Sequence, residues 1–317
     1  MRAVRFDRFG PPEVLGVGCS PEPHAGEGEV RIAVRTSGVS PVDLALRAGN
    51  SPSRDSLPLP HIPGVDAAGV IDEVGAGVEG FAVGDEVFGA VRVARLGGAG
   101  ARFAVLDFWA ARPSALPWEQ AGAAATGVET ATRALDLLGV GGVRPTTLLI
   151  DGATGGVGSI AVQLAVARGA RVIGTGRPGS DGFLAGLGAI PVAYGPGLAE
   201  RVRALGVPRI DHALDVAGAG SLGDLIALAG GVEPVVTLAD FTGPGRGVRL
   251  SLGAYGGQPD GRHGLAIAAD LAERGRFRVP VQAVFTAGRA SEAHAAVAVG
   301  PRLGKTVLDL AELSADA

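Results

Sequence analysis

Short apolar runs separated by glycine and proline fill the N-terminal part of the chain. Residues 29–35 alternate polar and apolar side chains, which is typical of a strand with one buried face. Residues 67–75 and 84–89 repeat this style, with turn residues on either side. Frequent turns without a long helical stripe predict a compact, mainly β domain over about the first 118 residues.

Longer, helical periods alternate with apolar strands in the next part of the chain. Residues 148–150 form a short apolar run, residues 159–168 have a helical pattern that ends at Gly169, and residues 171–175 predict the next strand. Further strands are predicted at 210–216 and 234–238. Strands that alternate with helices predict an α/β domain, a doubly wound parallel sheet covered on both faces.

The C-terminal part returns to a mixed pattern. The pattern predicts helices at 265–274 and 290–299, and strands at 279–285 and 305–310.

Composition narrows the class of protein. A chain of 317 residues favours two domains, and the net charge of -4 gives no reason to expect nucleic acid or an anionic membrane as a partner. The single cysteine excludes a disulfide framework and a zinc site made of several thiolates. The first residues have no apolar signal-peptide core, and no uncharged apolar run is long enough to span a bilayer. We therefore expect a soluble protein of a reducing compartment, the cytoplasm.

The strongest chemical signal is a glycine-rich turn between the strand at 148–150 and the helix at 159–168. The pattern Ala-x-Gly-x-x-Gly is typical of a dinucleotide loop, in which the backbone approaches a pyrophosphate and the helix N-terminus faces the phosphates. The predicted cofactor-binding residues of this loop are Ala153, Thr154, Gly155, Gly156, Val157 and Gly158. A structural turn without a ligand is the alternative interpretation, because the chain contains 53 glycines.

The end of the following strand indicates which dinucleotide binds. An acid about 20 residues beyond the glycines would favour NAD, but Gly176 and Arg177 stand there instead. A small residue leaves room for a 2′-phosphate, and an arginine can bind it with two hydrogen bonds, so the sequence favours NADP. Alternatively, Arg177 is a solvated loop residue. Asp181 is expected to start the next helix rather than to bind the ribose.

The carboxyl ends of the later strands should also border the cofactor, because ligands of such sheets bind at that edge. This adds the backbones of Ala217, Leu238 and Ala239 to the predicted cofactor site.

Five short segments stand in a specific order and spacing along nearly the whole chain: 37–43 (SGVSPVD), 63–71 (PGVDAAGVI), 84–88 (GDEVF), 151–158 (DGATGGVG) and 304–308 (GKTVL). Together they resemble the motifs of the medium-chain dehydrogenase/reductase superfamily, and within it those of the zinc-free quinone oxidoreductase (zeta-crystallin-like) branch.

The resemblance implies a GroES-like catalytic domain built from residues 1–118 and 270–317, and a Rossmann domain at 119–269 that binds NADPH. It also implies a homodimer. Tyr194 falls where members of the family place a tyrosine near the 2′-phosphate, although it could instead be an ordinary residue at a strand end.

Two departures from the family matter for the chemistry. The zinc-dependent branch places Cys and His where this chain has Ser40 and Val65, and valine cannot bind a metal, so we expect no metal site. Members without zinc often carry Asn at position 40 and a tyrosine at the position of Ala45. Their absence suggests a roomier, more apolar pocket.

Without zinc there is no Lewis acid to polarise a ketone, so the acceptor must already be activated. We expect a reductase that transfers hydride from NADPH to a quinone or to a carbonyl-conjugated alkene, which leaves an enolate-like oxyanion. Ser40, Thr126 and Thr130 are candidate donors to that oxyanion, or else structural hydroxyls. Asp43 is either an acid/base group or an anchor for Arg47 or a backbone turn.

Three other functions stay open at this stage. The first is a tailoring enoyl or ene reductase of a biosynthetic pathway, the second a non-catalytic NADPH-binding protein, and the third a zinc-type alcohol dehydrogenase.

Overall fold

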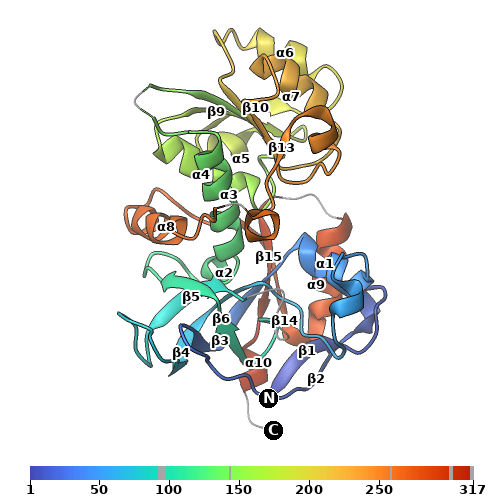
Figure 1. Ribbon diagram of the computed structural model, residues 1–317, viewed down its shortest axis with the longest axis vertical. Coiled ribbons are helices and arrows are strands. Elements are labelled where there is room, and N and C mark those ends of the chain that lie inside the picture. The colour runs from blue at the N-terminus through green and yellow to red at the C-terminus, as the bar shows by residue number, and fades with distance from the viewer. Residues whose placement is uncertain (92–97, 143, 258, 300–302, 315–317) are drawn as a thin grey trace. The chain divides into compact units, whose positions relative to one another are not determined.

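The structure is a computed structural model that describes residues 1–91, 98–142, 144–257, 259–299 and 303–314 (Figure 1). The chain divides into two compact units. Unit 1 comprises Met1–Thr126 and Leu265–Ala317, and unit 2 comprises Gly127–Gly264. The sequence analysis had placed these divisions at 118/119 and 269/270.

Unit 1 is built on a seven-stranded sheet with the strand order β14-β15-β3-β4-β5-β7, in which β6 pairs with β3. The strands are β3 (Val30–Val39), β4 (Asp66–Val74), β5 (Glu86–Ala90), β6 (Phe103–Leu106), β7 (Phe108–Ala111), β14 (Val281–Thr286) and β15 (Lys305–Asp309). A separate antiparallel pair consists of β1 (Arg2–Phe6) and β2 (Leu15–Cys19). The mainly β character predicted for this part of the chain is confirmed.

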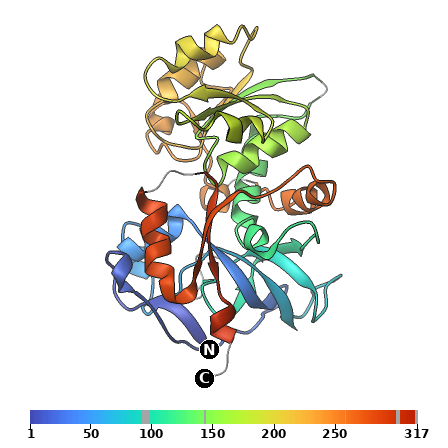
Figure 2. The same ribbon diagram turned by 180° about the vertical axis from the view of Figure 1, so that it is seen from behind.

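The two ends of the chain meet in this sheet. β15 pairs antiparallel with β3, and its other neighbour β14 runs parallel to it. Both views show the red C-terminal strand beside the blue N-terminal one (Figures 1 and 2). In β3, alternate side chains from Val30 to Val34 are buried, as the sequence pattern predicts.

The helices of unit 1 are short. They are η1 (Pro12–Val14), α1 (Pro41–Ala48), η2 (Arg54–Ser56), α2 (Trp118–Ala121), η5 (Ala287–Arg289), α9 (Ala290–Val299) and α10 (Ala311–Ser314). Two more helices cross a division between the units: α3 (Ala125–Leu137) and α8 (Gly264–Glu273). The sequence analysis missed α1, which interrupts the run of strands.

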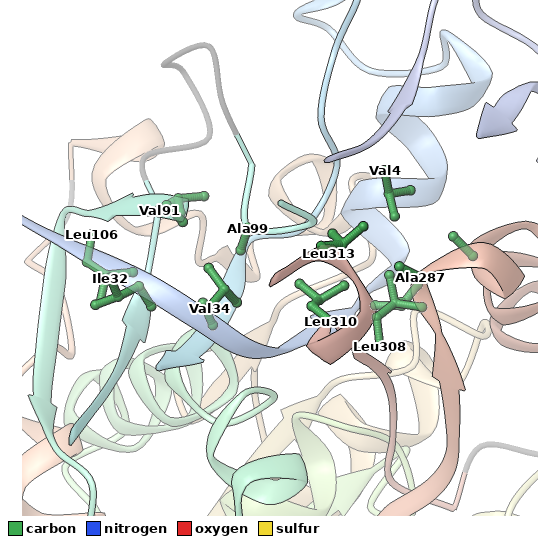
Figure 3. Packing of buried hydrophobic residues seen from close by; sticks show 14 of the residues in the cluster. Val4, Ile32, Val34, Val91, Ala99, Leu106, Ala287, Leu308, Leu310 and Leu313 are labelled. Atoms are coloured by element: carbon green, nitrogen blue, oxygen red, sulfur yellow. The ribbon is translucent and has the colours of Figure 1, made fainter. Parts of the chain in front are cut away.

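The core of unit 1 contains side chains from both ends of the chain. Val4 and Val34 pack in one cluster with Leu308, Leu310 and Leu313, and each of these side chains is at most 2% exposed (Figure 3). Burying a side chain of this size contributes about 1.5–3 kcal/mol. The C-terminal segment is therefore part of the folding unit and not an appendage.

Unit 2 contains the predicted doubly wound sheet. Its six strands are all parallel, in the order β10-β9-β8-β11-β12-β13. They are β8 (Thr147–Asp151), β9 (Arg171–Gly176), β10 (Ala189–Ala193), β11 (His212–Asp215), β12 (Val235–Thr237) and β13 (Arg249–Leu250). The chain runs from β8 outward to β10 and then returns to β11 on the other side of β8. The order therefore reverses between β8 and β11, where such sheets bind their ligands.

Helices pack on this sheet. They are α4 (Gly158–Ala167), α5 (Asp181–Ala185), α6 (Leu198–Ala204) and α7 (Leu222–Ala229), with the short turns η3 (Gly243–Arg246) and η4 (Gly253–Gly256). α4 packs against β8 and β9, and its residues from Gly158 to Ala165 are all buried. An apolar helix of this kind is stable only when it is covered. Asp181 starts α5, as expected.

Within the part of the chain that the structure describes, no helix has the length and apolar character needed to cross a membrane.

Candidate cofactor and active site

The glycine-rich loop connects β8 to α4 as predicted. Gly152 has a φ of +82°, which lets the chain turn at the end of β8. The Gly155 N–H donates to the Gly152 carbonyl at 3.2 Å, and the Ser159 N–H donates to the Gly155 carbonyl at 2.9 Å. The loop is therefore held by its own backbone.

Gly158 and Gly155 of this loop are glycines for different physical reasons. A Cβ at Gly158 would lie 2.1 Å from the Gly152 carbonyl oxygen, so the close approach of α4 to β8 requires glycine there. A Cβ at Gly155 would meet nothing nearer than that same oxygen at 3.5 Å, an ordinary contact. Packing within the protein therefore requires glycine at position 158 but not at position 155. A glycine at position 155 is instead what we expect where a ligand approaches the backbone closely.

The loop and the first turn of α4 also present free donors. Among the described residues, none accepts a hydrogen bond from the backbone N–H of Thr154, Gly156, Val157 or Gly158. Unpaired N–H groups at the positive end of a helix dipole are suited to a phosphate. The loop residues therefore fit the pyrophosphate of a dinucleotide.

Ala153, in the first glycine slot, is fully buried. Its N–H donates to the Thr175 carbonyl at 3.1 Å, and a Cβ on Gly174 of β9 would lie 2.9 Å from the Ala153 Cβ. A glycine on the neighbouring strand thus accommodates the methyl group that replaces the usual loop glycine.

The end of β9 brings together the residues predicted to choose the dinucleotide. Ala193 of β10 is in register with Gly176, and the Tyr194 N–H donates to the Gly176 carbonyl at 3.1 Å. Arg177 and Tyr194 therefore leave the sheet side by side. A Cβ at Gly176 would lie 2.2 Å from Ser180 Oγ and 2.9 Å from Thr154 Cγ2, so this edge also adjoins the phosphate loop.

Both side chains at this edge are open to solvent. Arg177 is exposed, and no described residue forms a hydrogen bond or ion pair with its guanidinium. Tyr194 is 48% exposed, which is high for an aromatic side chain. An arginine without a partner beside an exposed phenol fits a site for an added phosphate.

The remaining predicted cofactor residues lie at the ends of β11 and β12. The N–H groups of Ala217 and Gly218 donate to Asp215 Oδ1 at 3.1 and 2.8 Å, and the Leu238 N–H donates to the Asp215 carbonyl at 2.8 Å. The Ala239 N–H donates to Thr237 Oγ1 at 3.3 Å. A Cβ on Gly152 would lie 3.0 Å from Ala217, so the β11 turn lies beside the phosphate loop.

A buried polar layer, which the sequence analysis missed, supports these turns. Thr175 Oγ1 and Ser221 Oγ both donate to the carboxylate of Asp151, and Thr237 Oγ1 donates to Asp215 Oδ2 at 2.8 Å. Burial raises the pKa of Asp215, hydrogen bonds from Gly218 and Thr237 partly oppose this, and the nearby Asp151 raises the pKa further. The only signal in the sequence was an aspartate at the end of two predicted strands, Asp151 and Asp215.

Ser40 and Asp43 form a compact cap at the start of α1. Asp43 Oδ2 accepts from Ser40 N at 2.8 Å and from Ser40 Oγ at 2.7 Å, while Oδ1 accepts from Gly64 N at 2.8 Å. Burial raises the pKa of Asp43, and its hydrogen bonds from Ser40 and Gly64 oppose that effect. Asp43 thus anchors a backbone turn. It makes no hydrogen bond to Arg47, whose Nε and Nη1 are buried without a partner among the described residues.

Thr126 belongs to a second buried cluster. Its N–H and Oγ1 donate to the two carboxylate oxygens of Asp66, at 2.7 and 2.8 Å, and Lys305 Nζ donates to Asp66 Oδ2 at 2.9 Å. Asp66 is fully buried and Lys305 is 6% exposed. The sequence analysis quoted both charged residues within motifs but gave them no role. The single lysine within an apolar strand was the available signal.

Thr130 lies four residues after Thr126 in α3 and belongs to unit 2; its hydroxyl donates to Glu129 at 3.1 Å. Ser40, Asp43 and Thr126 belong to unit 1, whereas every predicted cofactor residue belongs to unit 2. Within the described ranges, no group of three or more His, Cys, Asp or Glu side chains is arranged to hold a metal ion.

Comparison with known families agrees with both units. Residues 26–135 match the alcohol dehydrogenase GroES-like domain, and residues 188–308 match the zinc-binding dehydrogenase family.

Two curated relatives illustrate the match in sequence. A quinone oxidoreductase of Sus scrofa is 37% identical over 179 residues, which are 55% of this chain and 52% of the relative. A 2-methylene-furan-3-one reductase of Solanum lycopersicum is 32% identical over 199 residues, which are 60% of this chain and 50% of the relative. The chain thus matches about half the length of these curated relatives.

Solved structures match along nearly the whole chain. An NAD-dependent alcohol dehydrogenase has a TM-score of 0.82 at 30% identity, with 98% of this chain and 100% of that one covered. The quinone oxidoreductase of Coxiella burnetii has a TM-score of 0.82 at 26% identity, with 98% and 99% covered. A mycobacterial protein complexed with NADPH has a TM-score of 0.78 at 25% identity, with 98% and 100% covered.

These matches confirm the predicted fold class, a GroES-like domain combined with a doubly wound Rossmann sheet, and they confirm the resemblance found in the motifs. The chain belongs to the medium-chain dehydrogenase/reductase superfamily, with quinone oxidoreductases among its relatives.

Proposed function

We propose that this protein is an oxidoreductase that uses NADPH to reduce a quinone or a carbonyl-conjugated alkene without a catalytic metal ion. The observation that carries the proposal is the glycine-rich loop of unit 2, whose N–H groups at the start of α4 have no acceptor among the described residues. The names of the two curated relatives, a quinone oxidoreductase and a furanone reductase, support the two classes of acceptor.

The residues of unit 2 would hold the cofactor in three places. The N–H groups of Thr154, Gly156, Val157 and Gly158 would bind the pyrophosphate. The guanidinium of Arg177, which no described residue binds, would bind the 2′-phosphate beside Tyr194. The backbones of Ala217, Leu238 and Ala239 would border the rest of the dinucleotide at the strand ends. When bound, NADPH would supply the hydride.

Arg177 would determine the preference for NADPH. A charge-assisted hydrogen bond to a phosphate contributes about 1.5–3 kcal/mol, which corresponds to roughly a ten- to hundred-fold preference over NADH. No acid at the end of β9 competes for the guanidinium, since the next acidic residue, Asp181, starts α5.

Position 65 argues against a family-type catalytic zinc, because Val65 offers no ligand atom where the zinc-dependent branch has histidine. A zinc-type alcohol dehydrogenase stays the alternative, and stoichiometric zinc found by metal analysis of the purified protein would favour it. Without a Lewis acid, the acceptor must be activated by its own conjugation.

Ser40 and Thr126 stay candidates for contact with the acceptor oxygen, with Asp43 as the residue that positions Ser40. Each hydroxyl now donates its proton to a buried carboxylate. To stabilise an oxyanion, it would have to turn that proton toward the acceptor. A proton from solvent would complete the reduction.

The expected homodimer and small-molecule substrate remain proposals. Light scattering of the purified protein would measure the first, and a substrate panel the second.

The decisive experiment measures NADPH oxidation with a panel of quinones and enones, together with the dissociation constants of NADPH and NADH. Arg177→Ala should weaken NADPH at least tenfold and NADH less than twofold. Arg203→Ala, which removes another exposed arginine of unit 2, serves as the matched control and should change neither.

The outcomes separate the competing functions. Equal losses for both nucleotides in Arg177→Ala would refute the phosphate role. Saturable binding without turnover on any acceptor would indicate a non-catalytic NADPH-binding protein. Turnover confined to enones would favour the tailoring enoyl or ene reductase over the quinone reductase.

A further inference from the structure

The loop after β10 is held by one side chain. Arg201 of α6 donates to four consecutive carbonyls: Nε to Ala193 at 3.0 Å, Nη2 to Tyr194 at 3.1 Å and to Gly195 at 2.9 Å, and Nη1 to Pro196 at 2.8 Å. All three nitrogens of the guanidinium are thus bound to this loop.

Two backbone hydrogen bonds from the start of α6 also reach this loop, from the Leu198 N–H to the Gly195 carbonyl at 3.1 Å and from the Arg201 N–H to the Gly197 carbonyl at 3.2 Å. Gly195 and Gly197 have φ values of +90° and +78°, a region that glycine enters freely. The Tyr194 N–H is tied to the Gly176 carbonyl at 3.1 Å, but the Tyr194 side chain is 48% exposed. The direction of the phenol therefore depends on the backbone of residues 193–196, and Arg201 fixes that backbone.

This loop lies beside Arg177. Because Ala193 is in register with Gly176 on parallel strands, the residues that follow, Tyr194 and Arg177, emerge at the same sheet edge. Arg177 brings a guanidinium that no described residue binds, and Tyr194 is 48% exposed. Arg201 uses four of its five N–H donors on the carbonyl oxygens of its own loop, so its guanidinium is committed to the backbone.

We infer that Arg201 is a positioning residue for the 2′-phosphate: it holds Tyr194 next to Arg177, so that the two side chains together select NADPH over NADH. The inference rests on the proposed function and deepens it. It assigns cofactor selectivity to a residue that does not touch the phosphate.

Two properties distinguish positioning from the other roles that Arg201 could have. A direct phosphate ligand would keep much of its effect when replaced by lysine, since lysine preserves the charge. A carbonyl clamp would not, because an ammonium cannot reproduce the planar fork that reaches four acceptors. A purely structural residue would affect both nucleotides equally.

The test measures dissociation constants by protein fluorescence or calorimetry at fixed ionic strength for NADPH, NADH, adenosine 2′,5′-bisphosphate and 5′-AMP. The variants are Arg201→Met and Arg201→Lys. Arg203→Met is the matched control, because Arg203 is an exposed arginine of the same helix. Arg201→Met combined with Arg177→Ala completes a double-mutant cycle.

Both Arg201 variants should weaken NADPH and the bisphosphate about tenfold, while NADH and 5′-AMP change less than twofold and Arg203→Met changes none of them. In the Arg177→Ala background, the effect of Arg201→Met on NADPH should shrink to less than threefold. Unchanged NADH binding would itself show that the variants are folded.

If the wild-type protein shows no preference for NADPH, the proposed cofactor fails and the inference fails with it. If the wild-type preference is present and Arg201→Met retains it, only the inference is overturned. Equal losses for NADPH and NADH, or a normal Arg201→Lys variant, would also overturn the positioning role.

Discussion

Two buried histidines should make the stability of unit 1 depend on pH. His61 is 5% exposed and His294 is 1% exposed, and the Nδ1 atom of each is buried without a partner among the described residues. Burial lowers the pKa of both from 6.5 to about 4, and the nearby guanidinium of Arg47 further lowers that of His294. Each ring is therefore neutral in the folded protein at pH values where the unfolded chain binds a proton.

The sign and size follow from linkage. Because the pKa is lower in the folded state, the contribution is fully present above pH 6.5 and is lost as the pH falls from 6.5 toward 4. At pH 5 each histidine should reduce the free energy of unfolding by about 2 kcal/mol, and the pair by about 4 kcal/mol, since each pKa unit corresponds to about 1.36 kcal/mol.

Tryptophan fluorescence can follow this effect in unit 1 alone. The chain has two tryptophans, Trp109 and Trp118, and both belong to unit 1. Urea unfolding monitored by their fluorescence at pH 7.5, 6 and 5 would give the free energy of unfolding at each pH. The measured quantity is the difference between pH 7.5 and pH 5, so a variant of lower overall stability still gives a valid result.

Replacing both rings with glutamine should reduce the loss between pH 7.5 and pH 5 from about 4 kcal/mol to less than 1 kcal/mol. Each single variant, His61→Gln or His294→Gln, should remove about half of the loss. His24→Gln is the matched control in the same unit, because the His24 side chain is 73% exposed. A double variant that keeps the wild-type dependence on pH would refute the reasoning.

The other predictions concern one buried ion pair and two glycines. Lys305→Met should lower the stability of unit 1 by about 3–5 kcal/mol, because it leaves the Asp66 carboxylate buried without its cation. Adding Asp66→Asn should recover part of this loss in urea unfolding, and a further loss instead would contradict it. Gly158→Ala should lower the melting temperature of unit 2, since its Cβ would meet the Gly152 carbonyl oxygen at 2.1 Å. Gly155→Ala should keep the melting temperature but weaken NADPH at least tenfold; normal NADPH binding in that variant would contradict a close approach of the phosphate at this residue.

The parts of the fold that were predictable depend on short-range patterns. The alternation in residues 29–35 and the helix at 159–168 are visible within a few residues, and both exist as predicted, in β3 and α4. Helix α1 was missed because its eight residues lie between strands. Its signal was local after all: Pro41 at the first position, Asp43 returning to Ser40, and Gly49 at the end with a φ of +74°.

The candidate site divides in the same way. The glycine-rich loop and Arg177 directly follow the strands β8 and β9, so the sequence pattern alone was enough to propose them as cofactor residues. The partners Asp66 and Lys305 are 239 residues apart. The four carbonyls that bind Arg201 are only five to eight residues from it, but every residue has a backbone carbonyl, so the sequence gives no sign of which ones bind. A pattern in one sequence cannot report such pairings, because they depend on how the elements pack.

Four buried aspartates share one arrangement, and it bears on how a reductase without a metal would work. Each carboxylate accepts a hydrogen bond from a hydroxyl and at least one more from a backbone N–H or a second hydroxyl. The four residues are Asp43 and Asp66 in unit 1, and Asp151 and Asp215 in unit 2. In unit 1 the hydroxyls that donate to these aspartates are those of Ser40 and Thr126, the two proposed to contact the acceptor oxygen. Both hydroxyls already donate hydrogen bonds to carboxylates, so donation to a substrate oxyanion would mean breaking a buried hydrogen bond. If these hydroxyls face the acceptor, as the proposed function has it, we expect quinones and enones, whose own conjugation stabilises the negative charge, to be reduced faster than simple ketones.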